Sequence, residues 1–187
     1  MKTVTTVLLA LLMIGSAFAQ EPTQQQSFKP LEQLYAEWQK QDNERDLKYL
    51  GERRQEAEDE LAKFNGLIAK RDGGLTEKLK RALADGDGTL IEVALDNIWS
   101  NKRELDFSAE WVIDQHGKQL MESARSAYQK ELITEEQYTE HLGFFRKAKA
   151  RTEEVLPESL TKMVSEAKQK SPQYFARLER IGQPYPF

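Results

Sequence analysis

The segment Asp85–Thr89 (Asp-Gly-Asp-Gly-Thr) is the part of the sequence that most resembles a ligand site. Alternating aspartates and glycines between two helical stretches are typical of the middle of an EF-hand calcium loop. If Asp85 and Asp87 take the third and fifth loop positions, Leu83 and Ala94 fall where two carboxylate ligands belong. A degenerate calcium-responsive site at Asp85 and Asp87 is therefore one hypothesis. A tight turn between helices, in which the aspartates accept hydrogen bonds from nearby backbone N–H groups, is the other.

Carboxylates are the only abundant groups suited to acid–base catalysis. The chain has 31 aspartates and glutamates, so the proximity of any two carries little information. Glu110 is the most suggestive, because Trp111 follows it directly. A cell-envelope hydrolase or lyase that uses carboxylates near Glu110 is therefore an alternative function, against the simpler interpretation of a solvated glutamate beside a core tryptophan.

The two histidines, His116 and His141, do not have the spacing of metal ligands. The sequence contains no His-x-x-x-His, no Glu-x-x-His and no cysteine, which excludes the local signatures of zinc, di-iron and attached haem. His116 lies four residues from both Val112 and Leu120, so we expect a hydrogen-bonded histidine in the core. Nucleotide-binding and nucleophile-elbow motifs are also absent, and the sequence predicts no cofactor.

Two segments are candidates for interaction with another protein. The segment from 144 to 151 combines two aromatic residues with four basic ones, which favours an acidic partner. An aromatic tail at the end of the chain is expected to dock on its own domain or in a partner's groove. The interaction candidates are Phe144, Arg146, Lys147, Arg151, Tyr185 and Phe187. A net charge of −4, with both signs interspersed, gives no electrostatic case for nucleic acid.

The first 19 residues have the pattern of a cleaved secretory signal peptide. Lys2 precedes an apolar run, and Ala17-Phe18-Ala19 forms the small-residue cleavage site before Gln20. The apolar run is shorter than the roughly 20 residues needed to span a bilayer. We therefore expect an exported, most simply periplasmic, cysteine-free protein without stable membrane insertion.

Residues 20–29 are expected to be a flexible lead, and residues 30–187 a single helical domain. Pro30 suits the first position of a long charged helix, with an apolar stripe at Leu31, Leu34, Tyr35 and Trp38. The sequence predicts a break at Asp72-Gly73-Gly74 and then a short helix to Ala84.

The most apolar stretch is Leu90–Trp99, which is predicted to be the central helix, capped by Thr89. Leu90 and Val93 are expected to widen its apolar arc. Ser100-Asn101 is expected to separate it from a long helical region that reaches Leu132 with a kink at Gly117.

Three later boundaries are predicted from capping residues and prolines. Thr134 and Gln137 fit a capping box, in which each side chain bonds to the other residue's backbone N–H. Pro157 and Ser171-Pro172 are predicted to start further helices, and Gly182 to end the last one. The sequence thus predicts an all-α fold of five to seven helices.

The element Thr134–Gln137 resembles, over four residues, the Thr-x-x-Gln element of small helical periplasmic stress chaperones. The second copy expected in that family is missing here, so no membership follows. From export and the missing catalytic motifs we expect a non-enzymatic protein-binding protein of adaptor, chaperone or inhibitor type. Its partner is expected in the cell envelope.

Overall fold

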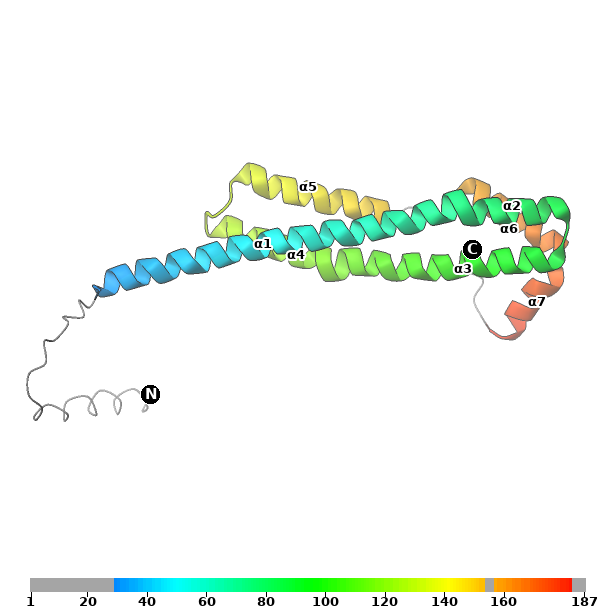
Figure 1. Cartoon of the computed structure of the whole chain (residues 1–187), viewed down its shortest axis with the longest axis horizontal. Coiled ribbons are helices and arrows are strands. Elements are labelled where there is room, and N and C mark those ends of the chain that lie inside the picture. The colour runs from blue at the N-terminus through cyan, green and yellow to red at the C-terminus, as the bar shows by residue number, and fades with distance from the viewer. Residues whose placement is uncertain (1–28, 154–156, 183–187) are drawn as a thin grey trace, which may run out of the picture. The chain divides into compact units, whose positions relative to one another are not determined.

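Five continuous helices make up residues 29–153 and 157–182, the part of the chain that the computed structural model describes (Figure 1). Two of them include a π-helical segment, in which one turn holds an extra residue. The elements are α1 (Leu31–Lys70), η1 (Arg71–Leu75), α2 (Thr76–Asp85), α3 (Gly88–Glu110), η2 (Trp111–Gly117), α4 (Lys118–Gln129), α5 (Glu135–Thr152), α6 (Glu158–Lys170) and α7 (Pro172–Arg180). The predicted all-α fold with a long N-terminal helix is confirmed.

The chain divides into two compact units, Met1–Trp38 and Gln39–Phe187, with the boundary inside α1. The described part of the first unit is the start of α1. Its apolar side chains are exposed, with 84% of Leu31, 68% of Tyr35 and 62% of Trp38 accessible to solvent. The predicted stripe therefore forms on a helix, but these three side chains are not core residues.

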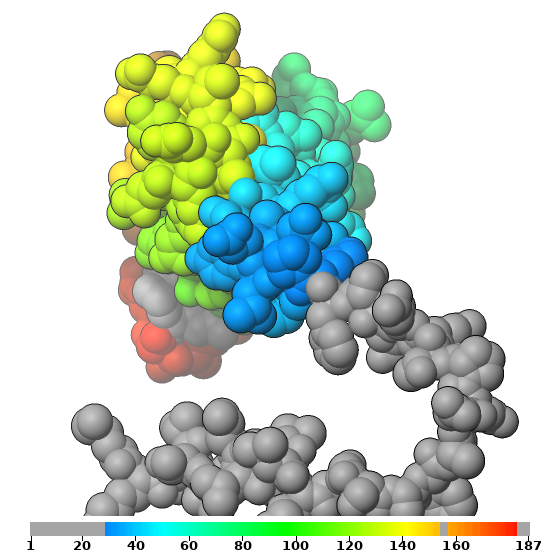
Figure 2. Space-filling view, turned by 90° about the vertical axis from the view of Figure 1, so that its left-hand side faces the viewer, coloured from blue at the N-terminus to red at the C-terminus, as the bar shows by residue number. Residues whose placement is uncertain are grey.

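The second unit contains three clusters of buried side chains along its length. One joins α2, α3, α6 and α7 and includes Leu79, Ile91 and Leu160. Another joins α1 and α4 through Leu50 and Leu120. The third brings α1, α3, η2 and α5 together: Phe64, Ile68, Leu105, Val112 and Ala148. Figures 1 and 2 show α5, in yellow, lying beside the cyan part of α1.

The predicted central helix is part of the longer α3. Leu95 is 2% exposed, in agreement with its predicted place in the core. Leu90 and Val93 are 48% and 52% exposed, so the expectation that they widen the buried face is wrong. The predicted interruption at Ser100-Asn101 is also wrong. Asn101 is buried inside α3, where its Nδ2 donates to the Leu67 carbonyl at 3.3 Å and its Oδ1 has no hydrogen-bond partner among the described residues.

Of the two glycine-rich segments, one continues as helix and the other forms a turn. Helix continues through Gly73 and Gly74 as η1, so the predicted break there is wrong. A π turn absorbs an extra residue without ending the helix. The predicted turn after α2 is present. Gly86 has a left-handed φ of 71°, and its N–H donates to the Ala82 carbonyl at 3.0 Å. The N-cap of α3 is Asp87, not Thr89.

The later boundaries agree with the predictions. Gln137 N donates to Thr134 Oγ1 at 3.2 Å and Thr134 N donates to Gln137 Oε1 at 2.8 Å, which confirms the capping box. Helix α6 begins directly after Pro157, and Pro172 is the first residue of α7. Gly182 follows α7 with a φ of 65°, as expected of a residue that ends a helix.

Among the described residues, no helix combines the length and apolar character needed to cross a bilayer. The predicted signal peptide lies outside the described residues, and so does the aromatic tail with Tyr185 and Phe187.

Candidate functional site

An open groove of about 550 Å³ lies between α1 and the end of α3 in the second unit. Its apolar wall comes from Leu67 on α1, Phe107 on α3 and Trp111 at the start of η2. Its charged rim consists of Glu60, Lys63 and Glu104. The groove thus opens where the regular α-helix changes to a π-helical segment, a feature often found at functional sites.

The groove presents a pair of aromatic rings to solvent. Phe107 and Trp111 are four residues apart, so they share a helix face, and their rings stack with centroids 5.8 Å apart and planes at 19°. Phe107 is 65% exposed and Trp111 40%. Exposed aromatic side chains grouped at one place are typical of surfaces that bind other proteins.

The charges at the rim are paired with one another. Glu60 contacts Lys63 on the same helix, and Lys70 Nζ lies 3.6 Å from Glu104 Oε2 on α3. The hydrogen bond and the negative charge of Glu60 raise the pKa of Lys63. Because each rim carboxylate has a lysine partner, burial of apolar surface rather than net charge would favour binding in the groove.

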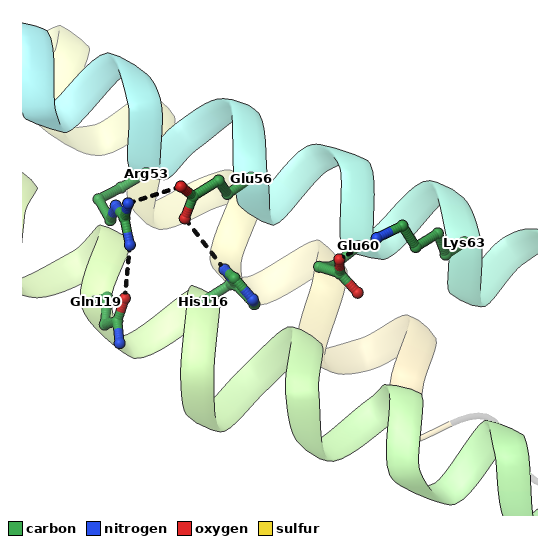
Figure 3. Close-up of polar contacts among 6 residues, drawn as sticks. All are labelled: Arg53, Glu56, Glu60, Lys63, His116 and Gln119. Carbon is green, nitrogen blue, oxygen red and sulfur yellow. Dashed lines mark hydrogen bonds and ion pairs between the residues drawn. The ribbon is translucent and has the colours of Figure 1, made fainter.

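A strip of polar contacts continues from the groove along the interface between α1 and η2–α4 (Figure 3). Arg53 lies between Glu56, at 2.6 Å, and Gln119, whose Oε1 accepts a hydrogen bond at 3.0 Å. His116 Nδ1 lies 3.4 Å from Glu56 Oε2, an ion-pair distance if the ring is protonated. The ring is mostly buried as predicted, but neither nitrogen forms the predicted hydrogen bond within the described structure.

The candidate catalytic residue lies on the surface of the second unit. Glu110 is exposed at the last residue of α3. Trp111, expected to be in the core, is instead part of the exposed groove wall, because the start of η2 places it beside Phe107.

Asp87 of the predicted calcium turn is the N-cap of α3. Asp87 Oδ1 accepts hydrogen bonds from Thr89 N at 2.9 Å and Leu90 N at 3.3 Å, and Asp85 is the last residue of α2. Across the described ranges, no three or more acidic, histidine or cysteine side chains are grouped as they would be to hold a metal ion.

The predicted basic segment does not form one surface. The Arg54 guanidinium covers the half-buried Phe144 ring at 4.0 Å, and Arg151 Nε donates to Asn65 Oδ1 at 2.9 Å, so both ends of the segment contact α1. Arg146 and Lys147 are exposed. Phe144 and Arg151 are therefore contacts between α5 and α1, whereas the basic residues between them, Lys149 included, are exposed.

Sequence reasoning missed the groove and its central residue Phe107. The four-residue spacing of Phe107 and Trp111 was a usable signal, but it does not distinguish an exposed aromatic pair from a core stripe. Comparisons of the chain with family models, curated proteins and solved structures give no match.

Proposed function

We propose that this chain is a non-enzymatic protein-binding protein, of adaptor, chaperone or inhibitor type, that receives an apolar segment of its partner in the groove between α1 and α3. The exposed, stacked pair of Phe107 and Trp111 carries the proposal. An amphipathic helix binds such a groove by inserting side chains spaced three or four residues apart. Aromatic side chains at the centre of an interface commonly contribute most of the binding free energy.

The proposal includes export of the protein to the periplasm, where the partner belongs to the cell envelope. The pattern of Met1–Ala19 supports this location. Cell fractionation followed by mass determination of the purified chain tests it. A periplasmic product that begins at Gln20 is expected, whereas an uncleaved cytoplasmic product contradicts this part of the proposal.

Site-specific photo-crosslinking tests the groove in the cell that naturally makes the protein. A photoreactive amino acid at position 107 is expected to give a discrete adduct with one partner, identified by mass spectrometry. The same amino acid at exposed Lys147 on α5 serves as the reference position.

Two glycines on α1 provide a matched pair of variants. Gly66 lines the groove and Gly51 does not, and an added β-carbon at either position meets nothing within 4 Å. We expect Gly66→Trp to fill the groove and remove the adduct, and Gly51→Trp to leave it unchanged. An adduct that persists in Gly66→Trp, or no adduct at position 107, would contradict the proposal.

A further inference from the structure

The start of α1 presents an apolar face to solvent in the described part of the chain. Leu31, Tyr35 and Trp38 are 84%, 68% and 62% exposed. Their spacing of four and then three residues places them on one side of the helix. Lys29 Nζ lies 2.6 Å from Glu37 Oε1, so these two neighbouring charges are paired. Covering the three side chains would be favourable, because it removes a continuous apolar surface from water.

The groove in the second unit has the form of a site for one further helix. Its walls are residues 60–67 of α1 and residues 104–111 of α3 and η2. The first wall includes Gly66, where an added β-carbon meets nothing within 4 Å, so the backbone of a bound helix can approach closely. The second wall presents the stacked rings of Phe107 and Trp111. A groove between two neighbouring helices typically binds the apolar face of a third.

The exposed face and the groove match in length and in spacing. Each wall extends over seven residue steps, which is about 10 Å at the helical rise of 1.5 Å per residue. Leu31 and Trp38 are also seven steps apart, and anchors at the first, fifth and eighth positions are typical of helices that bind in grooves. Lys70 and Glu104 pair at the groove as Lys29 and Glu37 pair beside the face, so contact leaves none of these charges unpaired.

We propose that the groove of one copy of this chain binds the start of α1 of a second copy, through Leu31, Tyr35 and Trp38. The inference rests on the proposed function, in which the groove receives an amphipathic helix, and it names a helix that the chain itself supplies. Because the contact joins two different surfaces, one intact α1 start and one intact groove are enough to form a pair. The contact is smaller than a standard interface of about 20–30 residues a side, so association is weak and depends on concentration.

Sedimentation equilibrium of the purified chain measures this association. The average mass is expected to rise about twofold or more as the concentration increases through the micromolar range, where small interfaces usually dissociate. A groove variant, Gly66→Trp, is expected to remain a single copy, and Phe107→Ser provides a second groove variant. A face variant, with serine in place of Leu31, Tyr35 and Trp38, is also expected to remain a single copy.

Two matched variants control for these substitutions. Gly51→Trp introduces the same large side chain on α1 outside the groove, and Val93→Ser removes an exposed apolar side chain of α3 that does not line it. Both are expected to associate like the original chain. Far-UV circular dichroism of every variant separates a loss of association from a loss of fold.

A mixture of the groove variant Gly66→Trp with the face variant identifies which surfaces meet. Neither associates alone, but the first supplies an α1 start and the second a groove, so the mixture is expected to form pairs. Contact between two α1 starts would instead let Gly66→Trp associate alone, and contact between two grooves would let the face variant do so. Either of these results, or a mixture that forms no pairs, overturns the inference.

Photo-crosslinking between two distinguishable copies locates the contact. An unlabelled chain with a photoreactive amino acid at position 107 is mixed with a ¹⁵N-labelled chain, and the adduct is expected to contain labelled residues 31–38. An adduct confined to one chain, or a single-copy mass at every concentration, overturns the inference. If such a single-copy chain still forms an adduct with a different protein in the cell through position 107, the proposed function stands and only this inference fails.

Discussion

Gly117 lies where η2 and α5 approach each other closely. An added β-carbon would lie 2.9 Å from Phe145 Cε2 and 2.9 Å from the Val112 carbonyl oxygen. The backbone oxygen cannot move aside easily, so we predict that Gly117→Ala lowers the free energy of unfolding by about 1–3 kcal/mol. Urea unfolding measured by circular dichroism checks the value.

The matched control for this substitution is Gly143→Ala on α5. Nothing lies within 4 Å of an added β-carbon at Gly143. Because alanine favours helix over glycine, this variant is expected to be more stable than the original chain by up to about 1 kcal/mol. If both substitutions stabilise the protein, α5 does not pack against η2 as closely as described.

Leu95 tests the core of the second unit. It is 2% exposed on α3, whereas Val93 on the same helix is 52% exposed. We predict that Leu95→Asp unfolds the chain, because an unpaired carboxylate in the core costs several kcal/mol. Val93→Asp should change the melting temperature little. A soluble, fully helical Leu95→Asp variant with an unchanged melting temperature would contradict this core.

His141 gives a stability prediction with a definite sign. Its pKa in the folded chain is lower than the ordinary 6.5, so the unfolded chain binds more protons as the pH falls below 6.5. Its contribution to stability is therefore largest above pH 6.5 and is lost between 6.5 and the lower folded pKa. Urea unfolding of the original chain and of His141→Gln at several pH values checks this, and the difference between the two is expected to change in that window.

Residue identity predicted burial well only where the helix face was unambiguous. Leu95 occupies the middle of an apolar stripe and is buried. The sequence predicts Trp111 in the core because large aromatic residues usually lie there, yet its neighbours across the interface leave a groove beside it. Hydrophobicity at one position does not reveal whether another helix covers it.

At the scale of elements, the start of α3 has two candidate N-cap residues, Asp87 in the structure and Thr89 in the sequence prediction. Asp87 Oδ1 accepts hydrogen bonds from the N–H groups of Thr89 and Leu90, and it is the N-cap of α3. We predict that Asp87→Ala costs about 1 kcal/mol of stability and that Thr89→Ala costs much less. Thermal unfolding of both variants checks which one loses more stability. A larger loss of stability for Thr89→Ala would identify Thr89 as the N-cap, as the sequence predicts.

The sequence predicts helix ends that are marked by a capping residue or a proline. It does not predict where a helix continues through residues that usually end one. The Thr134–Gln137 capping box and the prolines at 157 and 172 act within a few residues, so the sequence contains the whole signal. Asp72-Gly73-Gly74 and Ser100-Asn101 have the composition of a break, but tertiary contacts override it. Asn101 donates to the carbonyl of Leu67, a residue of another helix.

The groove could not be located from periodicity, because periodicity describes the faces of one helix and the groove lies between two. The groove combines residues 60–67 of α1 with residues 104–111 of α3 and η2, on two helices far apart in sequence. Predicting it therefore required the pairing of these two helices.

At the scale of the whole molecule, all three buried clusters belong to the second unit and extend from Leu50 to Leu178. We predict that a chain beginning at Gln39 folds cooperatively and melts within a few degrees of the chain that begins at Gln20, because its core is complete. Differential scanning calorimetry of the two chains checks this. A matched full-length variant replaces the exposed Leu31, Tyr35 and Trp38 with serine and should also keep the melting temperature. A melting temperature about 10 °C lower corresponds to a loss of more than 1 kcal/mol. If the shortened chain shows this loss and the serine variant does not, the backbone of the first unit stabilises the fold. If both show it, the three side chains do.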